Sequence, residues 1–434
     1  HKEYRRQRQM CIRDRPSPQQ SQATFMSSIR LTHASQILDG NCQITGSKSE
    51  SNRLLILQAL FPKLALDNLS NSDDTQAMQR GLASKDQTID IGHAGTTMRF
   101  LTSYFATTPG VEKVLTGSKR MQERPIKLLV DALRSIGAAI EYVKNEGYPP
   151  LLISGKAIST TRVSLAANVS SQYITSLMLV APKLPNGLEI VLEGEITSVP
   201  YINMTCALLQ RVGIDATFSG QSIRVLPQQS IDAKTLTVES DWSSASYHFS
   251  MVALAQSADV SINSYVPNSL QGDSVLVDIY AQLGVTATFD GHKLQLTKSD
   301  KVQSHIALDL IKAPDIAQTI AVTCYGLGVS CDLTGLHTLK IKETDRLVAL
   351  QNELTKLGAN IRITEDSLHL DARKGDIVAD VAIDTYHDHR MAMAFAPLGL
   401  SVPIVINDAD VVTKSYPSFW DDLISLGFFI DSDK

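Results

Sequence analysis

Several short segments of this 434-residue chain place cationic or hydroxyl side chains just before an apolar run. Residues 46–53 read GSKSESNR and lead into LLILQAL. A polar, serine-rich entry of this kind predicts a helix N-terminus. Its free backbone N–H groups, with Lys48 and Arg53 beside them, would bind an anion. An ordinary capped helix fits the same pattern, and the segment lacks the spacing of a Walker A loop.

Two further segments have the same character. Residues 93–99 read HAGTTMR, in which Gly95 would let a ligand approach the backbone closely. Residues 120–125 read RMQERP, in which two arginines flank a glutamate before Pro125, a residue suited to a helix start. An unremarkable helix end and a surface ion-pair loop are the respective alternatives.

Hydroxyl and amide groups cluster at a third predicted helix start. Ser170, Ser171 and Gln172 precede YITSLMLVAP, and Ser198 and Tyr201 follow some way along the chain. Such groups can donate hydrogen bonds to a sugar-like or phosphate ligand. Capping of the helix by serine explains the first of these residues equally well.

Acidic and basic residues are interleaved at residues 340–346, KIKETDR. On a helix, Lys342 and Arg346 would share a face beside Glu343. Two cations beside a carboxylate can hold an anion and supply a proton. A charge-laced surface helix is the alternative.

A charged block at residues 386–390, YHDHR, directly precedes the apolar run MAMAFAPLGL. A helix that is apolar on all sides is buried, so the charged block is expected at the N-terminus of a buried helix. The i,i+2 spacing of His387 and His389, without a distant partner, argues against a metal site. Lys414, in the sequence KSYP, adds a basic group near the C-terminus.

Taken together, these cations at element ends in both halves of the chain predict a cleft between two domains that binds small polyanions. Arginine suits this task because it forms bidentate pairs with phosphate and carboxylate. The net charge of −5 argues against a non-specific nucleic-acid binder, which would usually be basic. The cations concerned are Lys48, Arg53, Arg124, Lys342, Arg346, Arg390 and Lys414.

The length predicts two large domains. The five cysteines show no metal-binding or disulfide-framework spacing, so a reducing, cytoplasmic compartment is expected. No apolar run approaches the roughly 20 residues of a membrane span. Residues 1–25 are basic, polar and aperiodic and lack the apolar core of a secretory signal. We expect them to be disordered and not native to the gene product.

An internal repeat of about 70 residues runs along the chain. Each copy ends an amphipathic helix with a glycine and then starts an apolar strand, as expected for glycine at the C′ position. A weaker sixth copy contains Gly81. Asn-Gly at residues 186–187 and Asp-Gly at residues 290–291 predict hairpins, so mixed sheets are expected rather than a purely parallel barrel. The repeated glycines are Gly137, Gly213, Gly284, Gly358 and Gly427.

The combination of SKSxSNR, AGTxMR, RMxERP, SSQ, KETDR, DHRMAMAF and KSYP, in this order over residues 26–434, resembles the EPSP synthase family. The resemblance implies an α/β fold, a two-domain inside-out α/β barrel in which each domain holds three copies of a β-α-β-α-β-β unit. It implies an upper domain of residues 46–241, on the shikimate 3-phosphate side. The discontinuous lower domain would hold residues 26–45 and 242–434, with phosphoenolpyruvate, Asp315 and Glu343.

The resemblance also implies the activity, which is transfer of the enolpyruvyl group of phosphoenolpyruvate to the 5-hydroxyl of shikimate 3-phosphate. Asp315 would accept the hydroxyl proton, Glu343 would protonate the methylene carbon, and Lys48 would stabilise charge. No metal or cofactor is implied, and a monomer is expected. The residues implied for shikimate 3-phosphate are Lys48, Ser49, Arg53, Ser170, Ser171, Gln172, Ser198, Tyr201, Asp315 and Lys342. Those implied for phosphoenolpyruvate are Lys48, Gly95, Arg99, Arg124, Gln172, Arg346, Arg390 and Lys414.

The sequence departs from the family pattern at three positions. His93 and Thr338 stand where asparagine is usual, and Phe100 stands where proline is common. Two other functions stay open at this point. One is the sister transferase that acts on UDP-N-acetylglucosamine, which typically carries a cysteine in the loop that closes its site; residues 110–125 contain none. The other is a non-catalytic homologue that only binds metabolites.

Overall fold

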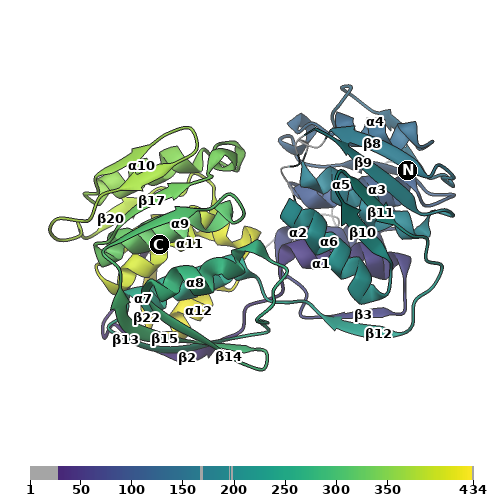
Figure 1. The fold of residues 1–434 in the computed structure, drawn as a ribbon. Helices are drawn as coiled ribbons and strands as arrows, with labels where there is room; N and C mark the ends of the chain where they lie inside the picture. The colour runs from purple at the N-terminus through teal and green to yellow at the C-terminus, as the bar shows by residue number, and fades with distance from the viewer. Residues whose placement is uncertain (1–27, 167–169, 195, 197–198, 433–434) are drawn as a thin grey trace, which may run out of the picture.

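The computed structural model describes residues 28–166, 170–194, 196 and 199–432. Its buried apolar side chains form two separate cores, which correspond to the two lobes in Figure 1. One core runs from Leu54 to Val238, and we call this part the middle lobe. The other combines residues 29–44 with residues 242–428, and we call it the terminal lobe because both ends of the chain contribute to it.

The chain crosses between the lobes twice, and the two crossing segments run side by side. The Ser47 N–H donates to the Glu239 carbonyl at 2.8 Å, and the Asp241 N–H donates to the Thr45 carbonyl at 3.2 Å. Gly46 and Ser240 form an antiparallel bridge between them. A cavity between the lobes is therefore bordered by residues that directly follow each crossing.

The sheets repeat one plan. Five of the six sheets among the described residues have four strands, in which a parallel pair is followed by two antiparallel strands. In the middle lobe they are β4 (Thr88–Asp90), β5 (Glu112–Thr116), β7 (Leu151–Ser154) and β6 (Ala139–Tyr142), and β8 (Arg162–Ala166), β9 (Leu188–Glu193), β11 (Ser222–Val225) and β10 (Ala216–Ser219). The sixth sheet pairs β3 (Leu64–Asp67) with β12 (Lys234–Thr237) in parallel.

The terminal lobe holds the other three four-stranded sheets. They are β2 (Ile37–Cys42), β13 (Ser257–Asn263), β15 (Lys293–Val302) and β14 (Leu283–Asp290); β16 (His305–Asp309), β17 (Ser330–Thr334), β19 (Leu368–Leu370) and β18 (Ile361–Ile363); and β20 (Val381–Ile383), β21 (Ile404–Asn407), β1 (Ser28–His33) and β22 (Phe428–Ser432). In this last sheet the first strand of the chain lies between the last two, which joins both ends of the chain in one lobe.

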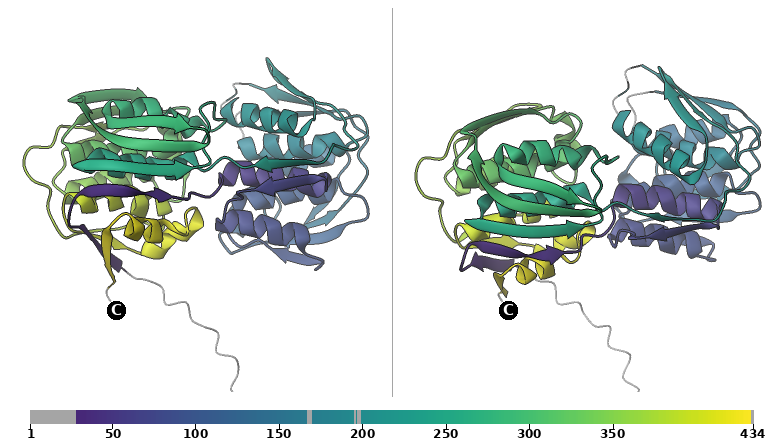
Figure 2. Two further views of the ribbon diagram at one scale, coloured as in Figure 1. Left: turned by 90° about the horizontal axis from the view of Figure 1, so that it is seen from below. Right: turned by 60° about the horizontal axis from the view of Figure 1, so that its bottom comes forward.

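Largely buried helices alternate with amphipathic ones along the chain. The buried helices pack on one another within each lobe, inside the sheets (Figure 2), because apolar residues surround most of their circumference. They are α1 (Lys48–Leu60), α3 (Gly95–Ala106) and α5 (Ser171–Val180) in the middle lobe, and α7 (Trp242–Leu254), α9 (Ala317–Leu327) and α11 (His389–Phe395) in the terminal lobe. The others are α2 (Asp73–Ala83), α4 (Lys127–Ser135), α6 (Val199–Val212), α8 (Leu276–Ala281), α10 (Arg346–Lys356) and α12 (Phe419–Ser425).

The repeat predicted from glycine spacing is confirmed at four positions, where Gly137, Gly213, Gly358 and Gly427 directly follow a helix end with positive φ, as the C′ position requires. Gly284 also has positive φ, but it lies at the start of β14, beside a register shift in the pairing with β15. The sixth prediction was wrong, because Gly81 lies inside α2. A Cβ there would approach Leu101 to 2.5 Å, so close packing against α3 explains this glycine.

One of the two predicted hairpins is confirmed. Gly291 lies in the turn between β14 and β15, which pair antiparallel. The other prediction was wrong, because residues 186–187 join a 3-10 turn (Ala181–Lys183) to β9. The chain before this turn is helical, so it offers β9 no strand to pair with.

The mixed α/β class predicted from the sequence is confirmed by these elements. Within the part of the chain that the structure covers, no helix combines the length and apolar character needed to cross a membrane. The predicted disordered tail, residues 1–25, lies outside the described residues.

Candidate functional site

The site is a cavity of about 650 Å³ between the two lobes. Residues at or just before the N-terminus of all six buried helices line it. The helix dipole makes each such end positive, so six of them together favour a polyanion. The lining cations outnumber the lining carboxylates. The cations are Lys48, Arg53, Arg120, Arg124, Lys312, Lys342, Arg346, Arg390 and Lys414, and the carboxylates are Asp241, Asp273, Asp315 and Glu343.

Arg346 is the centre of an ion network in the terminal lobe. It is the first residue of α10 and is only 1% exposed. Its guanidinium donates to Asp388 at 2.7 Å, to Asp315 at 2.9 Å and to Glu343 at 2.9 Å. A buried arginine that binds three carboxylates has its orientation determined by them.

Asp388 holds two cationic segments together. Its side chain is fully buried and caps α11, accepting a hydrogen bond from the Arg390 N–H at 2.9 Å. The same carboxylate accepts from Arg346. Asp388 therefore connects the start of α10 to the start of α11, and this connection sets the spacing of Arg346 and Arg390.

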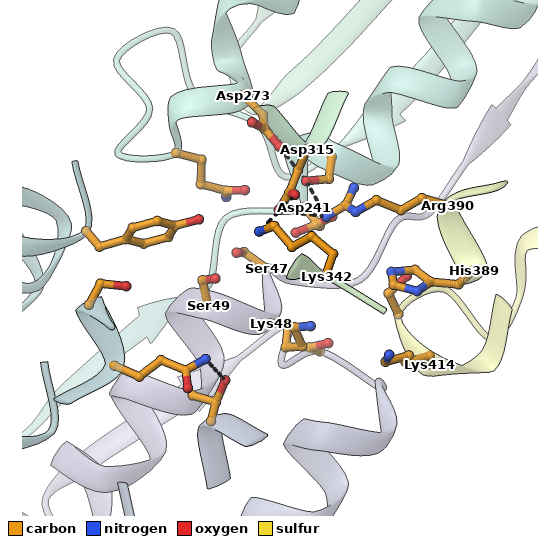
Figure 3. A pocket seen from close by; sticks show the side chains of 18 of the residues that line it. Ser47, Lys48, Ser49, Asp241, Asp273, Asp315, Lys342, His389, Arg390 and Lys414 are labelled. Carbon is orange, nitrogen blue, oxygen red and sulfur yellow. Dashed lines mark hydrogen bonds and ion pairs between the residues drawn. The ribbon is translucent and has the colours of Figure 1, made fainter. Parts of the chain in front are cut away.

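Asp315 lies just before α9 and is surrounded by three cations, of which Figure 3 labels Lys342 and Arg390. Its oxygens are 3.3 Å from the Lys342 Nζ, 2.9 Å from Arg346 and 3.3 Å from Arg390. Burial alone would raise the pKa of this carboxyl. The charges of Arg390, Lys342 and Arg346 outweigh burial and hold its pKa well below the usual range. Asp315 is therefore ionised in the free protein.

Glu343 lies on the other side of Arg346. Its carboxylate is 2.9 Å from Arg346 and 2.7 Å from the Lys414 Nζ. Burial opposes ionisation here too, but Arg346 and Lys414 prevail and lower the pKa of Glu343. The two carboxylates thus share one arginine and face the same cavity.

Arg53, in the middle lobe, is held differently. Arg53 donates to the hydroxyls of Thr205 at 2.9 Å and Thr175 at 3.3 Å, and to the Ser49 carbonyl at 2.7 Å. Burial lowers the pKa of Arg53 to about 10, so the guanidinium remains charged at neutral pH. Its charge is available to a ligand because its partners are neutral.

Neutral donors from two further helix starts face the same cavity. Ser170 caps α5 by accepting from the Gln172 N–H, which confirms the predicted cap. The Gln172 amide also donates to the Thr96 hydroxyl at 3.1 Å and so links α5 to α3. A smaller cavity of about 130 Å³ adjoins Gln172, Lys48, Gly95 and Lys414. Within it the backbone of Gly95 is so close to Arg124 that a Cβ would lie 2.5 Å from Nη1.

The structure brings together nearly all the residues implied by the sequence motifs. Arg99 is the exception among the described residues, because it lines neither cavity. It is buried and donates to the carbonyls of Gly95 at 3.2 Å and Pro125 at 3.1 Å. Ser198 lies outside the described residues. The implied residues that line one or both cavities are Lys48, Ser49, Arg53, Gly95, Arg124, Ser170, Ser171, Gln172, Tyr201, Asp315, Lys342, Glu343, Arg346, Arg390 and Lys414.

The three departures from the family pattern are placed as follows. His93 lines both cavities and is 3.7 Å from the Asp73 carboxylate. Phe100 lines the larger cavity, and the centre of its ring is 5.9 Å from the guanidinium carbon of Arg53. Thr338 lines neither cavity, and its hydroxyl is buried without a hydrogen-bond partner among the described groups.

The residues of the cavity wall that sequence reasoning missed include Asp241, Ser243 and Asp273. Asp241 caps α7, which is buried along nearly its whole length. A signal was present, because DWSS precedes an apolar helix just as YHDHR does. Asp273 carries no comparable local signal, since it lies in a short 3-10 turn (Gly272–Val275).

Known proteins resemble the chain over nearly its whole length. The profile of the family described as EPSP synthase (3-phosphoshikimate 1-carboxyvinyltransferase) matches residues 76–423. A Bacteroides fragilis protein named 3-phosphoshikimate 1-carboxyvinyltransferase is 45% identical over 404 residues, covering 92% of this chain and 98% of that protein. A Histophilus somni protein of the same name is 35% identical over 427 residues, covering 91% and 98%.

The fold has a counterpart among solved structures. EPSP synthase from Acinetobacter baumannii superimposes with a TM-score of 0.79 at 20% identity, covering 94% of this chain and all of that one. This agreement concerns the fold; the family profile and the similarity to the Bacteroides and Histophilus proteins establish that the chain belongs to the EPSP synthase family.

Proposed function

We propose that the protein transfers the enolpyruvyl group of phosphoenolpyruvate to the 5-hydroxyl of shikimate 3-phosphate and releases phosphate. Family membership supports the reaction. The observation that carries the assignment of the site is the placement of Asp315 and Glu343 on either side of Arg346, inside a cavity rich in cations. Both substrates are small polyanions, and the reaction needs one group that accepts a proton and one that donates a proton.

Shikimate 3-phosphate is assigned mainly to the middle lobe. Arg53 and Lys48 supply positive charge, and the groups at the start of α5 supply hydrogen bonds. Phosphoenolpyruvate is assigned to the region between Arg124 and Lys48 on one side and Arg346, Arg390 and Lys414 on the other. Arg99 reaches the carbonyl of Pro125, so its contacts support a role in holding the loop of Arg124.

Asp315 is assigned as the base and Glu343 as the acid. In the free protein both carboxylates are counter-ions of the cations that must bind substrate. Anionic groups of the substrates compete for the same cations. Once Arg390, Lys342 and Lys414 turn to the substrates, the pKa of each carboxyl rises. Asp315 thereby becomes a stronger base, and Glu343 becomes able to hold the proton that it donates.

The addition is accompanied by two proton transfers, and the loss of phosphate follows it. Asp315 removes the proton of the 5-hydroxyl as its oxygen bonds to the enol carbon, and Glu343 protonates the methylene carbon. In the tetrahedral adduct, Glu343, now a carboxylate, takes back one proton of the new methyl group as the carbon–carbon double bond re-forms and the bond to phosphate breaks. Asp315 gives the proton that it took to the departing phosphate, so both carboxyl groups return to their starting states. Lys48, at the start of α1, stabilises the negative charge that develops on the leaving group.

Several finer features belong to the same proposal. We assign the domain division to residues 46–241 and to residues 26–45 with 242–434, which the two separate cores support. The inside-out barrel, built from three repeats per domain, is supported by the common plan of five sheets around buried helices. The cytoplasmic location and the monomeric state remain predictions from the sequence.

Phosphate release by the purified protein tests this function. Shikimate 3-phosphate with phosphoenolpyruvate should release phosphate, and omission of either should abolish release. UDP-N-acetylglucosamine in place of shikimate 3-phosphate is the matched control and should give none. Release only with the sugar nucleotide would favour the sister transferase, and release with neither acceptor would favour a binding protein.

A further inference from the structure

Ser243 stands between Asp273 and Arg390 in the cavity wall. Arg390 Nη2 donates to the Ser243 hydroxyl at 3.3 Å and to Asp315 at 3.3 Å. The Ser243 hydroxyl in turn donates to Asp273 Oδ2 in a short hydrogen bond. Figure 3 shows Asp273 and Arg390 on either side of Asp315. None of the sequence motifs pointed to Asp273 or Ser243.

The direction of the Ser243 hydroxyl decides whether it can hold Arg390. A serine hydroxyl has one proton to donate and two lone pairs to accept with. Because Asp273 takes the proton, the lone pairs remain for the Arg390 N–H. Without an acceptor at residue 273 the hydroxyl would rotate freely, and its proton would repel the guanidinium in part of its orientations.

The contact of Arg390 with Asp315 changes in strength during the proposed reaction. In the proposed function Asp315 takes up a proton during each turnover, and its attraction for Arg390 falls when it does so. The contact with Ser243 does not change at that step. We infer that Asp273 is a positioning residue, which holds Arg390 toward the cavity through the hydroxyl of Ser243. The inference rests on the proposed function, which assigns Arg390 to phosphoenolpyruvate.

The charges around Asp273 support this role. Burial, with the carboxylates of Asp315 and Asp241, raises the pKa of Asp273 to about 6 against the opposing effects of Arg390 and of the hydrogen bond from Ser243. A carboxylate kept beside two others, where its charge is disfavoured, is typical of a functional position rather than of a stabilising ion pair.

Steady-state kinetics of four variants test the inference. Asp273→Ala and Ser243→Ala should each raise the KM for phosphoenolpyruvate by about 10-fold or more, as expected for a lost hydrogen bond to a charged group. The KM for shikimate 3-phosphate should change by less than about threefold, because Arg53 and the start of α5 are untouched. Asp273→Asn keeps an oxygen acceptor and should restore most of the affinity. Asp278→Asn, which removes an exposed carboxylate nearby, is the matched control and should behave like the unmodified protein.

A double variant tests whether Asp273 acts through Ser243. If it does, the Asp273→Ala change should have little further effect in a Ser243→Ala background. Additive losses, or an unchanged KM for phosphoenolpyruvate in Asp273→Ala, would overturn the inference. Should Asp273→Ala fail to fold, Ser243→Ala and Asp273→Asn carry the same expectations.

Arg390→Lys separates this inference from the proposed function. An unchanged KM for phosphoenolpyruvate in Arg390→Lys would remove Arg390 from the substrate site, and the assignment on which the inference rests would fail. A raised KM in Arg390→Lys, with no change in Asp273→Ala and Ser243→Ala, would refute the inference alone.

Discussion

Arg53 in the middle lobe is held in a different way from the paired cations of the terminal lobe. In the terminal lobe Arg346, Arg390 and Lys414 each contact at least one carboxylate. In the middle lobe Arg53 is held by hydroxyls and a carbonyl. A cation with neutral partners offers its full charge to a ligand, whereas a cation with an ionic partner exchanges that partner for the ligand.

This difference divides the proposed reaction between the lobes. The middle lobe is suited to bind an anion without any change in protonation. The terminal lobe is suited to couple anion binding to the pKa of its carboxylates, because ligand and carboxylate compete for the same cations. Variants in the terminal lobe should therefore affect turnover most, and variants in the middle lobe should affect affinity most.

The largest effect is expected from the proposed base and acid. Asp315→Asn and Glu343→Gln should each lower kcat by at least about 100-fold, because each removes an acid–base group. Phosphate release under saturating substrates measures this. Asp300→Asn, an exposed aspartate of the same lobe, serves as the control and should retain normal turnover. Near-normal kcat in either variant would refute the role of that residue.

Near the crossing segments lies a second buried glutamate, whose pKa is shifted in the opposite direction from that of Glu343. Glu50 is 1% exposed and accepts from the Gln271 amide at 3.1 Å. Burial, together with repulsion from Glu239, raises its pKa to about 7, whereas cations lower the pKa of Glu343. The folded protein thus keeps the Glu50 proton up to about pH 7, while the unfolded chain releases it near the ordinary pKa of 4.5. Stability should fall as pH rises between these values.

Glu50→Gln removes this dependence. We expect the variant and the unmodified protein to have similar free energies of unfolding at pH 4.5. Above pH 7 the variant should be more stable by up to about 3 kcal/mol, the value of a shift of this size. Denaturant unfolding across this pH range measures the difference. A difference that is constant with pH would contradict the raised pKa.

In the middle lobe, Arg53→Lys should mainly affect affinity. Lysine keeps the charge but loses the planar fork that binds phosphate in two places, so the KM for shikimate 3-phosphate should rise by about 10-fold. The effect on kcat should be smaller. Arg80→Lys, on the amphipathic helix α2, is the matched control. A fall in kcat as large as that of Asp315→Asn would break the proposed division between the lobes.

The smallest effect is expected at Gly95. A methyl group there would come within 2.5 Å of Arg124 Nη1, so the guanidinium must move away from the smaller cavity. Gly95→Ala should raise the KM for phosphoenolpyruvate several-fold, roughly 1 kcal/mol of a charge-assisted contact. The melting temperature should stay the same, because the displaced atom ends a flexible side chain. An unchanged KM would show that the Arg124 guanidinium does not bind phosphoenolpyruvate in the position that it has in this structure.

Local patterns predicted much of this molecule. Helix starts at Lys48, Ser171 and His389 follow from polar residues before apolar runs, and the C′ glycines follow from their spacing. Local pattern failed where a tertiary contact decides the structure. Gly81 resembles a helix end in sequence, but it lies inside α2 because Leu101 packs against it.

At the site, too, local sequence pattern fails where tertiary contacts decide the position of a side chain. Arg99 belongs to a recognisable motif, yet it lies one helical turn beyond Gly95, and its side chain reaches the Pro125 carbonyl instead of the cavity. Asp273 and Ser243 are 30 residues apart, and Arg390 is a further 147 residues from Ser243. Spacing along the chain holds no information on such contacts, which arise because α7 packs against both α11 and the turn of Asp273.

Binding of shikimate 3-phosphate to the Asp315→Asn variant, measured by titration calorimetry, tests the division between the lobes most directly. If the middle lobe holds this substrate without the help of an ionised Asp315, the dissociation constant should change by less than about tenfold while turnover is lost, since a neutral hydrogen bond is worth about 1 kcal/mol. A dissociation constant that rises as much as turnover falls would contradict the account.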